Sequence, residues 1–308
     1  MNTELQTVPA AVQRPTIGQV LGILVRLFKL RVVSLLLFAA LGGAFLGTGG
    51  VPPIGALLAI LVTGTLAAGG AAAINEYLER EADATARRTR HRPLVTGEIR
   101  KPAVVLWVAI AMITAAVLAV LPFRPAMALY LLLGALIYVG VYTVWLKPRS
   151  VLNIVIGGAA GSCAVMTGGA AVGAATHPGV IALALLVFLW TPAHFWALAM
   201  FYRDDYARSD VPMLPVRAAA HHTAWWIFIH AASTGLAALV LGVYPSLGWP
   251  YLLPTGAITI LMLLGSIRLI RSPERRQAIR LFVVSNLFLA LVLLSIIVVT
   301  TGRQLLSL

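Results

Sequence analysis

Residues 75–97, with the sequence NEYLEREADATARRTRHRPLVTG, place a dense group of charges directly after an apolar run long enough to cross a bilayer. If the helix of that run continues, Asn75, Glu79 and Asp83 are four residues apart and share one helix face. Oxygen ligands on one face, followed by an arginine-rich loop, are suited to a hard divalent cation bound to an anionic phosphate ester. A solvated loop whose charges only orient the helix would contain the same residues. This stretch alone leaves both interpretations open.

The composition identifies the class of protein. The chain has 308 residues, of which 60% are hydrophobic and only 11% are charged. A soluble domain cannot bury that much apolar surface, so we predict an all-α polytopic membrane protein, a bundle of nine transmembrane helices. Each helix is assigned to an apolar run of about 20 residues, the length that spans a bilayer. The predicted helices are residues 30–48, 54–76, 103–122, 126–146, 151–173, 179–201, 223–244, 250–270 and 280–300.

The basic residues predict the orientation of this bundle. Of the 23 lysines and arginines, all but Arg124 and Arg303 fall on one side of it. By the positive-inside rule, that side and the N-terminus are cytoplasmic, and the C-terminus is outside. We interpret residues 1–25 as a mostly disordered cytoplasmic tail without a signal peptide, and residues 26–308 as a single transmembrane domain of the plasma membrane. The net charge of +13 follows from loops that face anionic lipid, so no nucleic acid is expected as a partner.

A second acidic cluster lies in residues 201–216, FYRDDYARSDVPMLPV, after the sixth predicted helix. Of the ten acidic residues in the chain, all but Glu4 and Glu274 lie in this cluster or within residues 76–98. Acidic residues contribute little to membrane orientation, so this clustering favours a site over a solvated face. Two sets of carboxylates with arginines beside them are suited to Mg²⁺ and a diphosphate. A nucleotide is less favoured, because no glycine-rich phosphate loop precedes a helix.

The sixth predicted helix carries polar groups deeper in the membrane. Pro192 should kink this helix, and His194 is an ionisable residue inside a hydrophobic span, where such groups are usually functional. On a regular helix, His194 and Asp205 would share roughly one face, about 16 Å apart along the axis. His194 could instead be a core histidine bonded to a backbone carbonyl. Two further residues have an alternative role outside a site. Asn153 could cap the fifth helix, and Lys147 could serve only to set the membrane orientation.

Several sequence blocks together resemble one family. The chain is similar to the intramembrane aromatic prenyltransferases of the UbiA superfamily and, more narrowly, to the heme-farnesylating members of that superfamily. The blocks run in order over roughly residues 20–300; each is weak alone, but the set is specific. They are RTRHRPL (88–94) with Gly97, YTVWLK (142–147), NIVIGG (153–158), WTPAHFWAL (190–198), DY (205–206) and PMLPV (212–216).

The resemblance implies a reaction and its substrates. Mg²⁺ held by the two acidic motifs would bind farnesyl diphosphate and help its allylic C–O bond to ionise. A vinyl group of heme b would capture the farnesyl cation, and water would complete the side chain of heme O. The resemblance therefore implies Mg²⁺ as the cofactor and farnesyl diphosphate and heme b as substrates. The orientation predicted from the basic residues makes the active site face the cytoplasm. A heme A synthase is the candidate protein partner.

The resemblance also implies roles for individual residues. His194 would face the heme, either as an orienting group or as an axial ligand. The superfamily more often has aspartate where this chain has Glu79. The implied metal ligands are Asn75, Glu79, Asp83, Asp204 and Asp205. The implied catalytic residues are Asn75, Asp83, Asp205 and Arg88. The implied substrate-binding residues are Arg90, Arg92, Lys147, Asn153, His194, Arg203 and Tyr206.

Two other functions remain open at this stage. A related prenyltransferase that alkylates a quinone precursor would share the metal motifs but would not need the blocks around His194 and PMLPV. An anion transporter with basic gates belongs to another class. Transporters favour charged groups near the middle of the membrane, often in paired repeats, whereas the carboxylates here lie at helix ends on one side.

Overall fold

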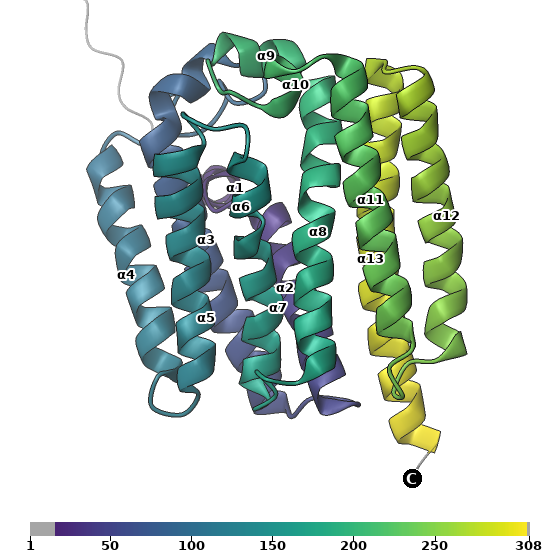
Figure 1. Cartoon of the computed structure of the whole chain (residues 1–308). Helices are drawn as coiled ribbons and strands as arrows, with labels where there is room; N and C mark the ends of the chain where they lie inside the picture. Colours follow the sequence, from purple (N-terminus) through teal and green to yellow (C-terminus); the bar gives the residue numbers. More distant parts are fainter. Residues whose placement is uncertain (1–15, 307–308) are drawn as a thin grey trace, which may run out of the picture.

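The helices of the computed structural model follow the apolar runs of the sequence (Figure 1). The structure describes residues 16–306, and every regular element in that range is helical. The elements are α1 (Ile17–Leu27), α2 (Leu30–Thr48), α3 (Ile54–Thr85), α4 (Pro102–Val120), α5 (Pro125–Leu136), the π-helix η1 (Ile137–Leu146), α6 (Asn153–Gly157), α7 (Ala159–Ala171), α8 (Pro178–Phe201), α9 (Arg203–Arg208), α10 (Leu214–Arg217), α11 (Ala220–Gly242), α12 (Trp249–Arg271) and α13 (Arg275–Leu306).

Nine helical segments within residues 16–306 are long and apolar enough to cross a membrane, and they match the predicted spans in order. Two of these segments are built from consecutive elements, α5 with η1 and α6 with α7. The largest difference from the predicted bounds is in α3, which runs for 32 residues to Thr85. The prediction of an all-α polytopic membrane bundle is confirmed, and the long α3 carries the first acidic motif on regular helix.

Glycines allow α2 and α7 to approach each other closely. A Cβ atom on Gly168 would lie 1.7 Å from the carbonyl oxygen of Ala40, and one on Gly43 would lie 2.3 Å from that of Val165. Larger residues at these two positions would clash with backbone, so the contact depends on glycine, as is common between membrane helices. Beside this pair, α8 packs against α7, α11 and α13 and is largely buried.

The N-terminal segment is more ordered than predicted from the sequence. Residues 17–27 form α1, so the disorder predicted for residues 1–25 is wrong for its last part, and residues 1–15 lie outside the described range. The side chain of Thr16 accepts a hydrogen bond from the backbone of Gln19, and the Gln19 side chain accepts one from the backbone of Thr16. This capping box satisfies two backbone donors and fixes the start of the helix.

The sixth span ends earlier than an extrapolated helix would. The chain leaves helical geometry at Tyr202, whose φ of −98° and ψ of 27° separate α8 from α9. The expectation that His194 and Asp205 share a face of one regular helix is therefore wrong. Asp205 lies on a separate short helix, which sets the direction of its side chain independently of α8.

The charged segments gather at one end of the bundle. Figure 1 shows α9 and α10 at the upper end and the C-terminus at the lower end. At the upper end Arg26 of α1 pairs with Glu98 of the loop after α3, and Arg275 of α13 pairs with Asp204 of α9. Helices from both ends of the chain thus meet around the two acidic motifs.

Candidate active site

The first acidic motif lies on one face of α3, as predicted. Asn75 and Asp83 are buried, and the side chain of Glu79 is only 11% exposed. Each carboxylate of the motif has a basic partner from elsewhere in the chain: Arg92 pairs with Asp83, and Lys147 pairs with Glu79. Arg92 also lies 3.7 Å, through Nε, from a carboxylate oxygen of Glu76. The loop arginine therefore bridges two carboxylates of α3.

Asn75 is held by two side chains that the sequence analysis did not assign to the site. Lys29 Nζ donates a hydrogen bond to Asn75 Oδ1 at 2.5 Å, and Asn75 Nδ2 donates to Thr143 Oγ1 at 3.0 Å. Lys29 has a left-handed backbone, with φ of 49°, between α1 and α2. Burial, together with the nearby charge of Arg92, lowers the pKa of Lys29 to about 7. No sequence pattern distinguishes Lys29 from the other basic residues near the membrane surface.

The π-helix η1 brings Thr143 to Asn75, and Lys147, directly after η1, reaches Glu79. The wider turns of η1 are closed by bonds such as that from the Lys147 amide to the Tyr142 carbonyl, at 2.8 Å. Thr143 Oγ1 donates to the carbonyl of Tyr138 at 2.8 Å, so its lone pairs face the amide of Asn75. The rings of Tyr138 and Tyr142 stack with centroids 5.8 Å apart, and Lys147 Nζ lies 5.6 Å from the centroid of Tyr142.

The two aspartates of the second motif have different surroundings. Asp205 is buried and pairs with Arg208, whereas the side chain of Asp204 is 64% exposed and accepts from Arg275 at 2.5 Å. The hydrogen bond from Arg275 lowers the pKa of Asp204 below its ordinary value. Of the pair, only Asp205 therefore resembles the buried carboxylates of the first motif.

The two motifs are connected through Arg88 and Tyr206. The guanidinium of Arg88, in the loop after α3, lies 4.8 Å from the ring centroid of Tyr206 on α9. This cation–π contact brings together two segments more than a hundred residues apart in the sequence. In contrast, Arg90 and Arg203 are exposed, and within residues 16–306 neither side chain makes a hydrogen bond or an ion pair.

Several buried polar atoms near these motifs have no hydrogen-bond partner within the described range. They are one carboxylate oxygen of Glu76, Nε of Arg88 and both side-chain polar atoms of Asn153. Asn153 is fully buried, and the N-cap of α6 is Leu152, so the interpretation of Asn153 as a helix cap is wrong. Buried polar groups are normally paired, and unpaired ones indicate a place where a ligand can bind.

The donors at this end fit Mg²⁺ with a diphosphate. The carboxylate oxygens of both motifs and the amide oxygen of Asn75 are hard ligands. Nε of Arg88, which has no partner among residues 16–306, is a donor for phosphate oxygen. Among residues 16–306, no three acidic, histidine or cysteine side chains already converge on one point, because each carboxylate is turned toward its own cation. A bound cation would have to draw the carboxylates away from these ion pairs. The diphosphate oxygens would then replace the carboxylates as partners of the arginine and lysine side chains.

His194 of α8 lies in an aromatic sandwich rather than on a backbone carbonyl. Its ring is stacked between those of Trp190, at a centroid distance of 4.1 Å, and Phe282, at 4.5 Å. Its Nδ1 is 2.8 Å from the hydroxyl oxygen of Ser285 on α13. The alternative of a histidine bonded to a neighbouring carbonyl is therefore wrong. Ser285 had no signal in the sequence, since the contact depends on how α8 and α13 pack.

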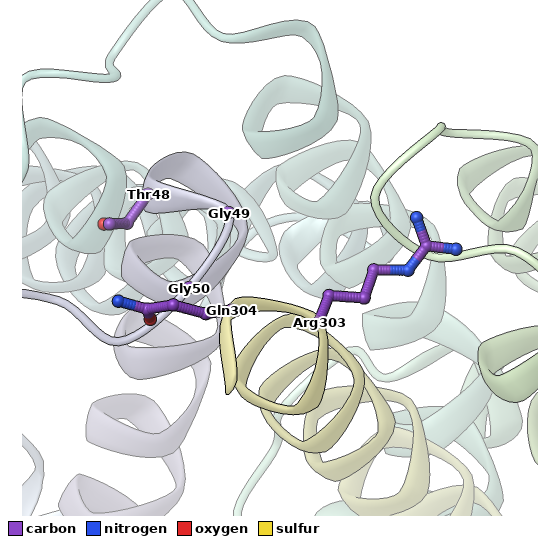
Figure 2. Close-up of a pocket in the computed structure, with 5 residues that line it drawn as sticks. All are labelled: Thr48, Gly49, Gly50, Arg303 and Gln304. Carbon is purple, nitrogen blue, oxygen red and sulfur yellow. The ribbon is translucent and has the colours of Figure 1, made fainter. Parts of the chain in front are cut away.

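A cavity of about 370 Å³ lies away from both motifs, at the opposite end of α2 from Lys29 (Figure 2). Arg303 at this cavity donates a hydrogen bond to the Pro245 carbonyl. None of the residues predicted for the site lines the cavity, so the candidate active site is defined by side-chain contacts at the charged end. The cavity is lined by Thr48, Gly49, Gly50, Arg303 and Gln304.

The chain is similar to known proteins over most of its length. A family model described as the UbiA prenyltransferase family matches residues 36–292. The chain belongs to the UbiA prenyltransferase family. The match spans both acidic motifs of this UbiA protein and confirms the family resemblance seen in its sequence blocks.

The most informative relatives agree in sequence and in fold. A protoheme IX farnesyltransferase of Metallosphaera sedula is 42% identical over 272 residues, covering 88% of this UbiA chain and 94% of the relative. A structure of digeranylgeranylglyceryl phosphate synthase is similar with a TM-score of 0.77 at 16% identity, covering 92% of this chain and 99% of that one. A UbiA homologue from Archaeoglobus fulgidus, solved with DMAPP and Mg²⁺, has a TM-score of 0.63 at 17% identity, covering 89% and 98%. At such identities the solved structures confirm the fold alone.

Proposed function

We propose that this UbiA-family protein transfers a farnesyl group from farnesyl diphosphate to a vinyl group of heme b and adds water to give heme O. The observation that carries the proposal is the 42% identity to a protoheme IX farnesyltransferase over nearly the whole length of that relative. The charged end of the bundle agrees with it, because carboxylates and arginines from two distant segments meet there. The product, heme O, would be the substrate of a further heme-modifying enzyme, and we propose a heme A synthase as this partner.

We propose that carboxylate and amide oxygens of the two acidic motifs hold Mg²⁺. Asp83 and Asp205 are the primary ligands, because both are buried; Asn75 and Glu79 complete the set on α3, and the exposed Asp204 is placed to act through water. When bound, Mg²⁺ would neutralise the diphosphate and stabilise it as a leaving group. A homologue of the same fold binds Mg²⁺ with an allylic diphosphate, which supports this assignment.

The basic residues have a direct role in this proposal. Arg92 and Lys147 now neutralise Asp83 and Glu79, and Nε of Arg88 has no hydrogen-bond partner among residues 16–306. Each can donate to diphosphate oxygens once the carboxylates bind the cation. Lys29, beside Asn75, adds a further donor at the same place. These basic side chains would stabilise the negative charge that develops on the diphosphate leaving group as the C–O bond breaks.

The bond changes in the proposed reaction balance without an additional reactant. The allylic C–O bond breaks, and its electron pair leaves with the diphosphate. The vinyl π electrons form the new C–C bond to the farnesyl carbon, and water adds to the resulting cation and releases one proton. The stacked rings of Tyr138 and Tyr142, beside Lys147, are placed to stabilise allylic positive charge through their π faces.

The proposal is tested by supplying purified protein with Mg²⁺, farnesyl diphosphate and heme b. A more hydrophobic heme should appear by chromatography, and removal of Mg²⁺ by a chelator should prevent its formation. Consumption of 4-hydroxybenzoate with heme left unchanged would identify a quinone-type prenyltransferase instead. Flux of diphosphate across proteoliposomes without chemical change would identify a transporter.

Thr143 is predicted to set the metal dependence of the reaction through Asn75. Replacing it with valine removes the acceptor for Asn75 Nδ2 and leaves the contact with Lys29 to orient the amide, whereas serine keeps the hydroxyl. Loss of such a supporting hydrogen bond typically costs about 10-fold in metal affinity. The Mg²⁺ concentration for half-maximal activity should rise by about 10-fold in Thr143→Val and stay near wild type in Thr143→Ser. An unchanged Mg²⁺ dependence in the valine variant would contradict this role.

The charged end is proposed to face the cytoplasm from the plasma membrane, since it collects the basic loops. Two exposed positions at opposite ends allow a test, Glu274 between α12 and α13 and Val243 after α11. The buried Cys163 is first replaced by alanine to remove its thiol. In intact cells a membrane-impermeant thiol reagent should label Val243→Cys and leave Glu274→Cys unlabelled. The reverse pattern would overturn the orientation.

A further inference from the structure

The hydrogen bonds around His194 fix which of its nitrogens carries the proton. Ser285 Oγ is 2.8 Å from the Phe282 carbonyl oxygen and 2.8 Å from His194 Nδ1. A carbonyl can only accept, so the single hydroxyl proton of Ser285 is donated to Phe282. The hydroxyl oxygen must then accept from His194, and both contacts are satisfied only if Nδ1 carries a hydrogen. In the neutral imidazole, the lone pair is consequently on Nε2.

The ring that carries this lone pair is held in place on several sides. Trp190 and Phe282 cover its two faces, and the Trp190 indole donates to the Ser285 carbonyl at 2.9 Å. His194 is only 7% exposed, and within residues 16–306 its Nε2 makes no hydrogen bond. The Nε2 atom itself is not among the buried unpaired atoms of the described range, so its lone pair lies at an accessible surface and is open to a ligand.

We propose that Nε2 of His194 is an axial ligand of the heme iron and that Ser285 is the residue that positions it. This inference rests on the proposed heme substrate. Iron-binding and other metal-binding histidines commonly donate their second ring nitrogen to an oxygen, which fixes the tautomer and the ring orientation. The contact between Nδ1 and Ser285 is an arrangement of this kind.

The position of His194 suits a substrate with a polar and an apolar part. It lies seven residues before the end of α8 at Phe201, which corresponds to about 10 Å along the helix axis. The iron would therefore lie below the charged end, inside the membrane layer, while the arginines at that end remain available to anionic groups. The aromatic rings of Trp190 and Phe282 provide an apolar contact surface for a flat macrocycle.

The experiment is resonance Raman spectroscopy of the ferrous heme b complex of the full-length protein. The wild type should show an iron–histidine stretching band, and His194→Ala should lose this band and regain an iron–nitrogen band when imidazole is added. The matched control is His230→Ala, a histidine of α11 that packs edge-on against Trp196, and it should keep the band. A band that persists in His194→Ala would overturn the proposal.

Ser285→Ala gives an independent measurement if His194→Ala cannot be recovered folded. Without the hydroxyl, the Nδ1 hydrogen loses its acceptor, so the iron–histidine band should shift to lower frequency while heme remains bound. An unshifted band would show that Ser285 does not position the ligand and would contradict the proposal. These outcomes can be distinguished from failure of the proposed function. If heme is farnesylated but His194 does not ligate its iron, the axial-ligand proposal is wrong and the proposed function stands. A wild type that neither binds nor modifies heme would remove the function itself.

Discussion

Replacing Asp83 with asparagine is expected to reduce the rate of farnesyl transfer by at least about 100-fold, because a metal-bound carboxylate contributes several kcal/mol of charge stabilisation. Asp83 is buried on the face of α3 that also carries Asn75, and its carboxylate is already paired with Arg92. Asparagine keeps the shape of the side chain and removes the negative charge. The measurement is the rate of heme product formation at saturating farnesyl diphosphate, with thermal unfolding of the purified variant as the test of folding.

Glu81 provides the matched control on the same helix. Its side chain is 90% exposed, and among residues 16–306 its ion-pair partner is Arg80 alone, at 3.4 Å. Glu81→Gln removes the same charge two residues away from Asp83 and should keep near-wild-type activity. If the two variants lost activity equally, the effect would arise from the general charge of the membrane surface and not from a site on one face of α3.

Asp205→Asn is expected to cause a loss of similar size, at least about 100-fold, because Asp205 is the buried carboxylate of the second motif. In the structure it is neutralised by Arg208, so loss of its charge also leaves that arginine without its partner. Asp210→Asn is the control: Asp210 lies in the turn after α9, its side chain is 97% exposed, and Arg217 approaches no closer than 3.6 Å. Near-normal turnover in Asp205→Asn would remove the second motif from the diphosphate site.

The first acidic motif could be predicted from the sequence because it depends on local helix geometry. Asn75, Glu79 and Asp83 follow each other at four-residue spacing, and a helix that continues past the membrane surface is sufficient to align them. The number and order of the membrane spans follow in the same way from the lengths of the apolar runs. Both predictions required no knowledge of which helices are neighbours.

The contacts that organise the site depend on packing between distant segments. Lys29 reaches Asn75 only because α2 and α3 are adjacent, and Ser285 reaches His194 only because α13 packs on α8. The periodic pattern of apolar residues also does not predict the π-helical geometry around Thr143. The prediction that α8 continues to Asp205 was wrong because no proline or glycine near Tyr202 indicates that the helix ends there.

The most direct test of the proposed activity is the mass of the heme formed by the purified protein from heme b, farnesyl diphosphate and Mg²⁺. We predict a product heavier than heme b by one farnesyl group plus one hydroxyl group, formed by the wild type and absent with Asp83→Asn. Recovery of heme b of unchanged mass from the folded, Mg²⁺-supplied protein would contradict the proposed function.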